Sequence, residues 1–198
     1  MESKPPTAVV AAAHADHLGD LPFADTRDFA DADRGFIAAL EPCVVTAADG
    51  RVVWDNDVYD FLVGEAPTSV HPSLWRQSML VAKQGLYEVA RASGATGEGA
   101  PGVYQVRGLD LSNVSFVEGD TGVIVIDPLV CTETAAAALA LYRAHRGQRA
   151  VSAVIYTHSH VDHFGGVLGV TTQADVDAGR VAVIAPEGFI DHAIQENV

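Results

Sequence analysis

The sequence predicts an α/β fold (in the broad sense that includes α+β), and three observations support this prediction. Short apolar runs typical of strands alternate with a helical segment along residues 101–198. Two of these runs, 114–118 and 123–126, flank a turn at 119–122, which predicts a β-hairpin. A cluster of histidine and aspartate residues follows the apolar run 151–156, and open α/β sheets place their ligands at such strand ends.

The other elements of residues 101–198 continue this alternation. A helix is expected over residues 133–146, because alanines favour it, Thr132 can cap its start and Gly147 can end it. Asp127 and the proline after it close the strand before this helix, since proline cannot donate to a strand ladder. Further strands are expected at 103–106 and 181–185, and a last helix from Pro186.

The residues before this domain are expected to form two further parts. Residues 1–25 mix proline, alanine, histidine and aspartate without a period, so we expect a loose N-terminal arm. His14 and His17 could form a ligand pair there, but a solvated tail is the favoured interpretation, because nothing fixes their geometry. Residues 26–100 are expected to form an N-terminal extension that ends in a glycine-rich loop at 93–99.

Two elements are expected within this extension. Residues 44–45 and 51–54 predict a hairpin. Residues 73–89 predict a helix with Ser73 as its N-cap. His71 stands alone in the sequence, and we interpret it as a structural residue.

Composition limits the partners of the chain. Of its 198 residues, 48% are hydrophobic and 19% charged, so it can bury a packed core of one domain, or of one domain and part of another. The formal net charge of -14 argues against nucleic acid and against an anionic membrane surface as partners. It does not exclude a small anionic substrate, because a pair of bound metal ions can dominate the field inside one pocket.

The sequence gives no sign of export or of membrane insertion. The apolar run at 8–13 is interrupted by His14 and is too short for a secretory signal, and no stretch approaches a membrane span. The two cysteines, Cys43 and Cys131, lie far apart and outside any C-x-x-C pair, so a disulfide framework is not expected. We therefore expect a cytoplasmic protein.

The strongest chemical signal is the run Thr157-His158-Ser159-His160-Val161-Asp162-His163. His158 and His160 are two residues apart, so in an extended segment both side chains point to the same side and can reach one ion. Asp162 and His163 follow where the chain must turn, and a turn can direct this second pair toward a neighbouring ion. Imidazole and carboxylate hold zinc and related divalent ions in hydrolases. The sequence therefore predicts half of each of two adjacent metal sites.

Two side chains could support this chemistry further. Two adjacent ions would activate a shared water molecule and stabilise charge that develops on a substrate. Asp162 could bind one ion and also orient that water, so a catalytic role is open for it. For Asp127 two interpretations are open: it accepts a hydrogen bond that orients the metal-binding loop, or it is simply a polar residue at a strand end.

The run 157–163 resembles the H-x-H-x-D-H signature of the metallo-β-lactamase superfamily. Further segments resemble the alkylsulfatase branch of that superfamily, the hydrolases of linear and secondary alkyl sulfates. These segments are 35–38, 52–55, 72–77, 110–113, 118–129, 156–166 and 185–189. The resemblance covers nearly the whole chain from about residue 28 onward.

The resemblance implies an αβ/βα sandwich with a binuclear site, usually zinc, of which residues 101–198 form the first half. It implies hydrolysis of alkyl sulfate esters to an alcohol and inorganic sulfate. His158 and His160 would bind one metal, and Asp162 and His163 the other. Members of this branch carry their remaining ligands much further along, so we expect an N-terminal fragment whose full-length parent forms a homodimer.

Two alternatives stay open beside this interpretation. The metal motif is shared by other hydrolases of the superfamily, such as lactonases, thioesterases and β-lactamases. The chain could also be a non-catalytic metal-binding fragment, because four ligands divided between two sites leave each ion under-coordinated. For this reason we expect little turnover from the isolated chain.

Overall fold

The computed structural model describes residues 4–92 and 99–197. Contacts divide the chain into two compact units: unit 1 comprises Met1–Arg34 and Val58–Lys83, and unit 2 comprises Gly35–Asp57 and Gln84–Val198. The domain boundaries expected at residues 25 and 100 stay predictions. Of the predicted glycine-rich loop, residues 93–98 lie outside the described residues.

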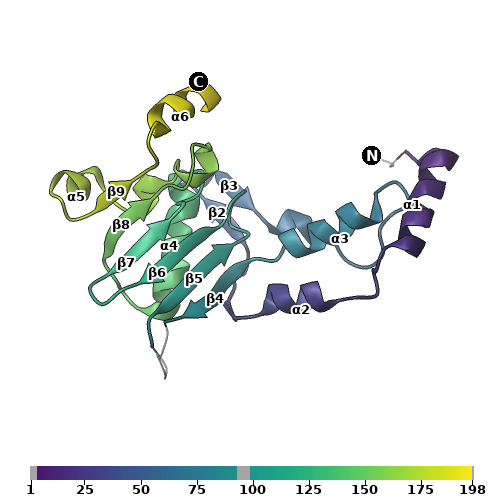
Figure 1. The fold of residues 1–198 in the computed structure, drawn as a ribbon, viewed down its shortest axis with the longest axis horizontal. Helices are drawn as coiled ribbons and strands as arrows, with labels where there is room; N and C mark the ends of the chain where they lie inside the picture. Colours follow the sequence, from purple (N-terminus) through teal and green to yellow (C-terminus); the bar gives the residue numbers. More distant parts are fainter. Residues whose placement is uncertain (1–3, 93–98, 198) are drawn as a thin grey trace. The chain divides into compact units, whose positions relative to one another are not determined.

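Unit 2 is built on one sheet with the strand order β1-β4-β5-β6-β7-β8-β9, and Figure 1 shows β4 to β9 side by side. Neighbouring strands pair antiparallel from β1 to β7, whereas β7, β8 and β9 pair parallel. The strands are β1 (Phe36–Ala38), β4 (Gly85–Arg91), β5 (Gly102–Arg107), β6 (Val114–Glu118), β7 (Val123–Ile126), β8 (Val151–Ile155) and β9 (Ala182–Ile184). A separate hairpin of β2 (Val44–Thr46) and β3 (Val52–Asp55) confirms the one predicted there.

The core of unit 2 lies between this sheet and helix α4 (Thr132–Arg146), which crosses one face of the sheet (Figure 1). Tyr104, Phe116 and Val125 form one row across β5, β6 and β7 on that face, and each is at most 1% exposed. The Phe116 ring stacks on Tyr142 of α4, with ring centroids 4.5 Å apart. This burial fixes the strand register, because a slip by one residue would turn the row to the other face.

The strands and the helix predicted for residues 101–198 are confirmed, with small differences at the helix ends. The N-cap of α4 is Cys131 rather than Thr132, and Gly147 ends the helix with a φ of 87°. Helix α6 (Phe189–Asn197) begins later than the predicted Pro186. In the described residues, the short helical segments are α5 (Gln173–Asp177) and the 3-10 turns Asp57–Tyr59, Val161–His163 and Val167–Gly169. None of the described helices is long and apolar enough to cross a membrane.

The helix predicted over residues 73–89 was wrong in its second half. Helix α3 spans Pro72–Val81, and the chain then enters β4. Gly85 has a φ of 133°, and a Cβ there would lie 2.5 Å from the backbone oxygen of Ala38. Glycine therefore lets β4 start this close to β1, and strand pairing with β1 and β5 overrides the helical spacing of the apolar residues.

Unit 1 contains α3 and two earlier helices, α1 (Ala8–Asp20) and α2 (Arg27–Asp33). The expectation of a loose arm was therefore wrong for the residues that α1 occupies. Thr7 caps α1 by accepting a hydrogen bond from the backbone N–H of Val10 at 3.4 Å. The alanines that follow favour helix through their intrinsic propensity, which requires no apolar period in the sequence.

His71 has close partners in unit 1, which agrees with its interpretation as a structural residue. Its Nδ1 accepts a hydrogen bond from the backbone N–H of Ser73 at 3.2 Å, which makes His71, and not Ser73, the N-cap of α3. Because Nδ1 accepts, Nε2 of a neutral His71 carries the hydrogen and donates it to Nδ1 of His17 at 2.8 Å. Nδ1 of His14 lies 3.0 Å from the backbone oxygen of Thr68. These contacts account for the three histidines without a metal ion.

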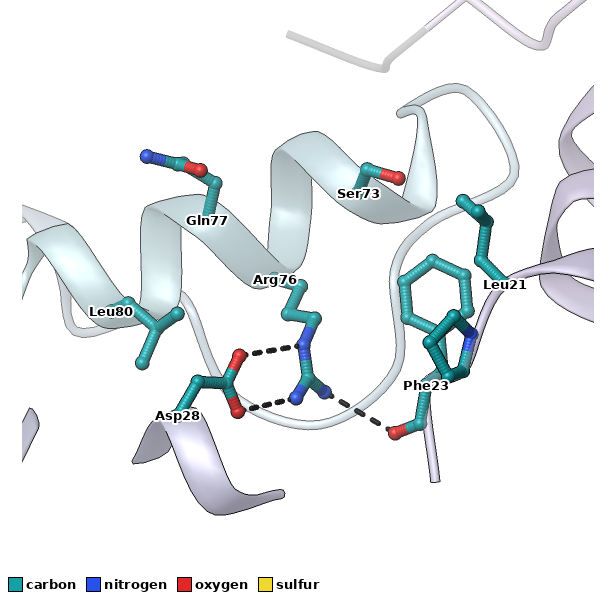
Figure 2. A pocket seen from close by; sticks show the side chains of 8 residues that line it. Leu21, Phe23, Asp28, Ser73, Arg76, Gln77 and Leu80 are labelled. Carbon is teal, nitrogen blue, oxygen red and sulfur yellow. Dashed lines mark hydrogen bonds and ion pairs between the residues drawn. The ribbon is translucent and has the colours of Figure 1, made fainter. Parts of the chain in front are cut away.

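Arg76 connects α3 to α2 and to the segment before α2, as Figure 2 shows. Its Nη2 and Nε donate to the Asp28 carboxylate at 2.5 and 3.1 Å, and its Nη1 donates to the backbone oxygen of Phe23 at 3.2 Å. The same side chain donates to the backbone oxygen of Asp25. The pocket drawn in Figure 2 is thus lined by an arginine that is already paired, together with the apolar side chains of Leu21 and Leu80.

A buried ion pair closes the core of unit 2 where β6 ends. The Glu118 side chain is 0% exposed, and its carboxylate accepts hydrogen bonds from Arg146 Nη2 at 3.0 Å and from the Tyr142 hydroxyl at 2.9 Å. Burial, and then the hydrogen bond to Glu118, raise the pKa of Tyr142, so this hydroxyl stays a donor. A charge in this position is tolerated only because each oxygen has a partner.

We expect the substitution Glu118→Ala to lower the free energy of unfolding by about 3–5 kcal/mol, because it leaves the Arg146 charge buried without its partner. Urea unfolding followed by circular dichroism measures this change. The matched control is Glu187→Ala at an exposed position, which should change stability by less than about 0.5 kcal/mol. Equal stabilities of the two variants would show that the ion pair does not hold the core.

Candidate metal centre

Parallel pairing of β7 and β8 brings Asp127 next to the histidine motif. Ile126 at the end of β7 is in register with Ile155 at the end of β8, and the backbone N–H of Asp127 donates to the backbone oxygen of Ile155 at 2.9 Å. Thr157 and the rest of the motif then follow from the same edge of the sheet. The motif therefore lies at the carboxyl end of a parallel strand, where the sequence placed it.

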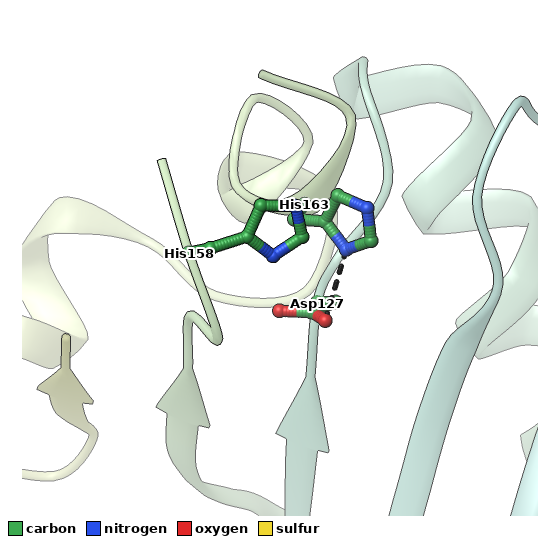
Figure 3. A group of neighbouring side chains, drawn as sticks. All are labelled: Asp127, His158 and His163. Carbon is green, nitrogen blue, oxygen red and sulfur yellow. Dashed lines mark hydrogen bonds and ion pairs between the residues drawn. The ribbon is translucent and has the colours of Figure 1, made fainter. Parts of the chain in front are cut away.

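The Asp127 carboxylate accepts three hydrogen bonds from the motif. Its Oδ1 accepts from the backbone N–H of Thr157 at 2.8 Å, and its Oδ2 accepts from the Thr157 hydroxyl at 2.7 Å. Nδ1 of His163 lies 2.9 Å from the same Oδ2, and Figure 3 shows this contact. Asp127 is 8% exposed and has a φ of 55°, a left-handed conformation that costs a non-glycine residue roughly 1–2 kcal/mol. The strained backbone therefore presents a buried acceptor to the motif.

These hydrogen bonds determine which ring nitrogen of His158 and of His163 keeps its lone pair. A carboxylate only accepts, so neutral His163 carries its hydrogen on Nδ1 and keeps a lone pair on Nε2. The Thr157 hydroxyl gives its one hydrogen to Asp127, so at 2.9 Å it can only accept from Nδ1 of His158. His158 therefore also has its lone pair on Nε2. The free nitrogens of both rings are thus available to an ion, as metal-binding histidines require.

The side chains of the motif form two close pairs. Nε2 of His158 lies 3.2 Å from Nδ1 of His160, and Nε2 of His163 lies 3.5 Å from Oδ2 of Asp162. Zinc–ligand distances are about 2.0–2.2 Å, so one ion can contact both atoms of either pair. The rings of His158 and His163 are 4.0 Å apart between centroids, which places the two pairs side by side. The four predicted ligands are therefore brought together, and the donor set suits divalent ions.

A different grouping of side chains is also close enough for one ion. One ligand atom each from Asp127, His158 and His163 lies within 4.8 Å of the others, and Figure 3 shows these three residues. Both oxygens of Asp127 already accept hydrogen bonds from the motif. Its geometry therefore fits better with orienting the histidines than with binding the ion directly, which is the first of the two interpretations left open by the sequence.

The glycines after the motif let the chain return closely against the segment between β7 and α4. A Cβ on Gly166 would lie 2.1 Å from the backbone oxygen of Pro128 and 2.6 Å from that of Cys131. A Cβ on Gly165 would lie 2.3 Å from the backbone oxygen of Val130. Larger residues cannot occupy these positions without moving backbone, so the glycine pair maintains the turn that carries Asp162 and His163.

Further side chains support the motif from loops outside it. The Ser112 hydroxyl donates to the backbone oxygen of Asp162. Asp110 is 5% exposed, and it accepts from the backbone N–H of Val130 at 3.1 Å and from the hydroxyl of Thr134 at 2.6 Å. Motif spacing gave no sign of these roles, because the partners lie many residues apart. The only signal was the likeness of residues 110–113 to the alkylsulfatase branch.

A protein-family model described as the metallo-beta-lactamase superfamily matches residues 107–198. Residues 107–198 therefore carry the pattern of this superfamily. The match begins in β5 and includes Asp127 and all four predicted ligands, so the site lies within the part of the chain that carries the family pattern. Similarity to this superfamily implies binding of a divalent metal.

Within this superfamily, the chain is similar in sequence to alkylsulfatases. The chain is 47% identical to an (R)-specific secondary-alkylsulfatase of Pseudomonas sp. over 100% of its length, and 48% identical to a linear primary-alkylsulfatase of Pseudomonas sp. over 99%. It is 48% identical to the alkyl/aryl-sulfatase BDS1 of Saccharomyces cerevisiae over 90%. The chain spans 28% of each Pseudomonas protein and 26% of the yeast protein.

A solved structure confirms the predicted fold class. The stereoselective inverting sec-alkylsulfatase Pisa1 from Pseudomonas sp. superposes with a TM-score of 0.87 at 47% identity. The superposition covers 100% of this chain and 30% of that protein. The structural similarity therefore includes the N-terminal residues as well as the sheet, as the resemblance of the early segments predicted.

We expect the substitution Thr157→Val to weaken zinc binding by about 10–100-fold, because it removes the hydroxyl that joins His158 to Asp127. Asp127→Asn should weaken it at least as much, because its amide nitrogen would replace one of the two acceptor oxygens and face a donor of the motif. Thr157→Ser keeps the hydroxyl and should retain the native affinity within about threefold. Competitive zinc titration of the purified chain measures these constants. Unchanged affinity in Thr157→Val would contradict the assigned hydrogen-bond chain.

Proposed function

We propose that the motif holds two divalent ions, with zinc as the preferred metal. Nε2 of His158 and Nδ1 of His160 would bind one ion, and Oδ2 of Asp162 and Nε2 of His163 the other. The observation that supports this assignment is the arrangement of hydrogens. Nδ1 of His158 and Nδ1 of His163 are occupied by oxygen acceptors, so the nitrogens that meet the neighbouring ligand atoms carry lone pairs.

We further propose that the protein of which this chain is part hydrolyses alkyl sulfate esters. The single observation that carries this proposal is the identity of 47–48% with two Pseudomonas alkylsulfatases over 99–100% of the chain. One of these relatives is named for secondary and the other for linear primary substrates. Their common chemistry is a sulfate ester on an alkyl carbon, and we assign that class to the chain.

The reaction consumes one water molecule and releases an alcohol and hydrogen sulfate. Two bound ions would polarise the water and neutralise the developing negative charge of the sulfate group. Asp162 would accept a hydrogen bond from the water and hold it toward the ester. Asp127 would hold the Nδ1 hydrogen of His163 through its carboxylate, so that Nε2 keeps its lone pair for the ion.

The net charge of the chain is compatible with an anionic substrate only if positive charge is present locally. The described side chains of the site are three imidazoles and an aspartate, with Asp127 beneath them. The ions would therefore supply the charge that attracts the sulfate group. Homodimerisation, a cytoplasmic location and the lack of a nucleic-acid partner stay predictions.

The function can be tested in a hybrid in which this chain replaces the matching segment of the Pseudomonas secondary-alkylsulfatase. We expect the purified hybrid to release sulfate from dodecyl sulfate or from a secondary alkyl sulfate. His158→Ala and Asp162→Ala should lower this rate by at least about 100-fold, because each removes a metal ligand. Ion chromatography of sulfate measures the rate, and Glu187→Gln, an isosteric change at an exposed position, serves as the control.

The same preparations separate this proposal from its rivals. A folded hybrid that binds zinc but releases no sulfate would contradict the alkylsulfatase assignment. Hydrolysis of a lactone, a thioester or a β-lactam by such a hybrid would favour another activity of the superfamily. Zinc binding without any hydrolysis would favour a non-catalytic metal-binding role.

A further inference from the structure

Glu196, near the end of α6, meets the centre of the metal-binding motif. Ser159 lies between His158 and His160, is 9% exposed, and donates its hydroxyl hydrogen to Oε2 of Glu196 at 2.6 Å. The neighbouring Asn197 donates from Nδ2 to the backbone oxygen of Ser159 at 3.1 Å. Two consecutive side chains of α6 thus hold the residue that separates two predicted ligands.

The same carboxylate faces the remaining nitrogen of His160. Nδ1 of His160 lies 3.2 Å from Nε2 of His158, whereas Nε2 of His160 lies 4.0 Å from Oε2 of Glu196. A histidine that binds an ion through Nδ1 carries its hydrogen on Nε2, and metal-binding histidines usually donate that hydrogen to an oxygen. Each histidine of the motif would then have an oxygen partner: Thr157 for His158, Asp127 for His163 and Glu196 for His160.

An independent contact fixes where α6 lies. Tyr156 and Phe164, which flank the motif, pack with Phe189 at the start of α6, at centroid distances of 5.3 and 5.2 Å. The tyrosine and Phe164 rings are 5.9 Å apart and complete the cluster. Phe189 and Glu196 are separated by about 10 Å along a helix. The aromatic contact at one end and the Ser159 contact at the other therefore hold α6 against the motif.

The electrostatics of α6 itself do not favour a carboxylate at Glu196. The carbonyl end of a helix dipole favours cations and disfavours carboxylates, and α6 has no basic residue in its last turn. The contact with Ser159 and the approach to His160 provide a reason for the carboxylate.

We propose that Glu196 is a positioning residue of the metal centre, which orients His160 through Nε2 and holds the motif through Ser159. The proposal rests on the proposed function, because it requires that His160 binds an ion. Glu196 does not bind the ion itself in this assignment. Its carboxylate instead selects the Nε2–H form of His160 and thereby directs Nδ1 toward the site shared with His158.

Titration of the 198-residue chain with cobalt(II), followed by visible absorption, tests this proposal. We expect Glu196→Ala to weaken binding of the cobalt ion by about 10-fold or more and to shift its absorption bands, because His160 loses its orientation. Glu196→Gln keeps an acceptor oxygen for Ser159 or His160 and should recover part of the affinity. Glu187→Gln should bind cobalt as the native chain does. Ser159→Ala should weaken binding while leaving the positions of the bands unchanged, because His160 keeps its partner.

The outcomes distinguish this inference from the function on which it rests. Native affinity and native bands in Glu196→Ala would overturn the positioning role while leaving the metal centre intact. Failure of the native chain to bind cobalt would overturn the metal centre and the positioning role together. Urea unfolding without metal should give similar midpoints for Glu196→Ala, Glu196→Gln and the native chain, so that a general loss of folding does not explain the affinity change.

Discussion

The hydrogen bonds of the Asp127 carboxylate determine how the candidate metal centre is built. One carboxylate, at the end of β7, accepts hydrogen bonds from the backbone and the hydroxyl of Thr157 and from the ring of His163. Through Thr157 the same group also sets the hydrogen of His158. These bonds join the end of β7 to the loop that follows the neighbouring parallel strand, β8. Without them, the imidazoles could rotate or exchange the protonated nitrogen, and the ligand pairs would lose their common orientation.

The rest of unit 2 holds Asp127 in this position. The buried row that includes Phe116 and Val125 packs on α4, and α4 is the connection that makes β7 and β8 parallel. Glu118 and Arg146 close the opposite end of this layer with a buried ion pair. Asp127 has a left-handed backbone, and the turn at Gly165 and Gly166 packs closely against the residues that follow it. The packed layer thus presents a buried carboxylate with a left-handed backbone at the end where the motif lies.

Spacing along the chain predicted the part of the site that is local. His158 and His160 are two residues apart, so the sequence alone placed them on one side, and the apolar strand before them placed the motif at a sheet edge. Contacts between distant residues were not predictable in this way, because Thr157 meets Asp127 and Ser159 meets Glu196 only after the sheet and α6 are formed. Two local predictions also failed. The residues of β4 have helical spacing but pair as a strand, and α1 forms from alanine propensity and a threonine cap rather than from an apolar period.

The most direct test of the central claim is the tautomeric state of the histidines. Long-range nitrogen–proton NMR correlations on the metal-free, nitrogen-15-labelled chain distinguish hydrogen on Nδ1 from hydrogen on Nε2. The hydrogen-bond chain through Asp127 predicts that neutral His158 and His163 both carry hydrogen on Nδ1, and that Thr157→Val releases His158 from this state. Hydrogen on Nε2 of His158 or of His163 in the native chain would contradict the account, because the nitrogen assigned to the metal would then be blocked.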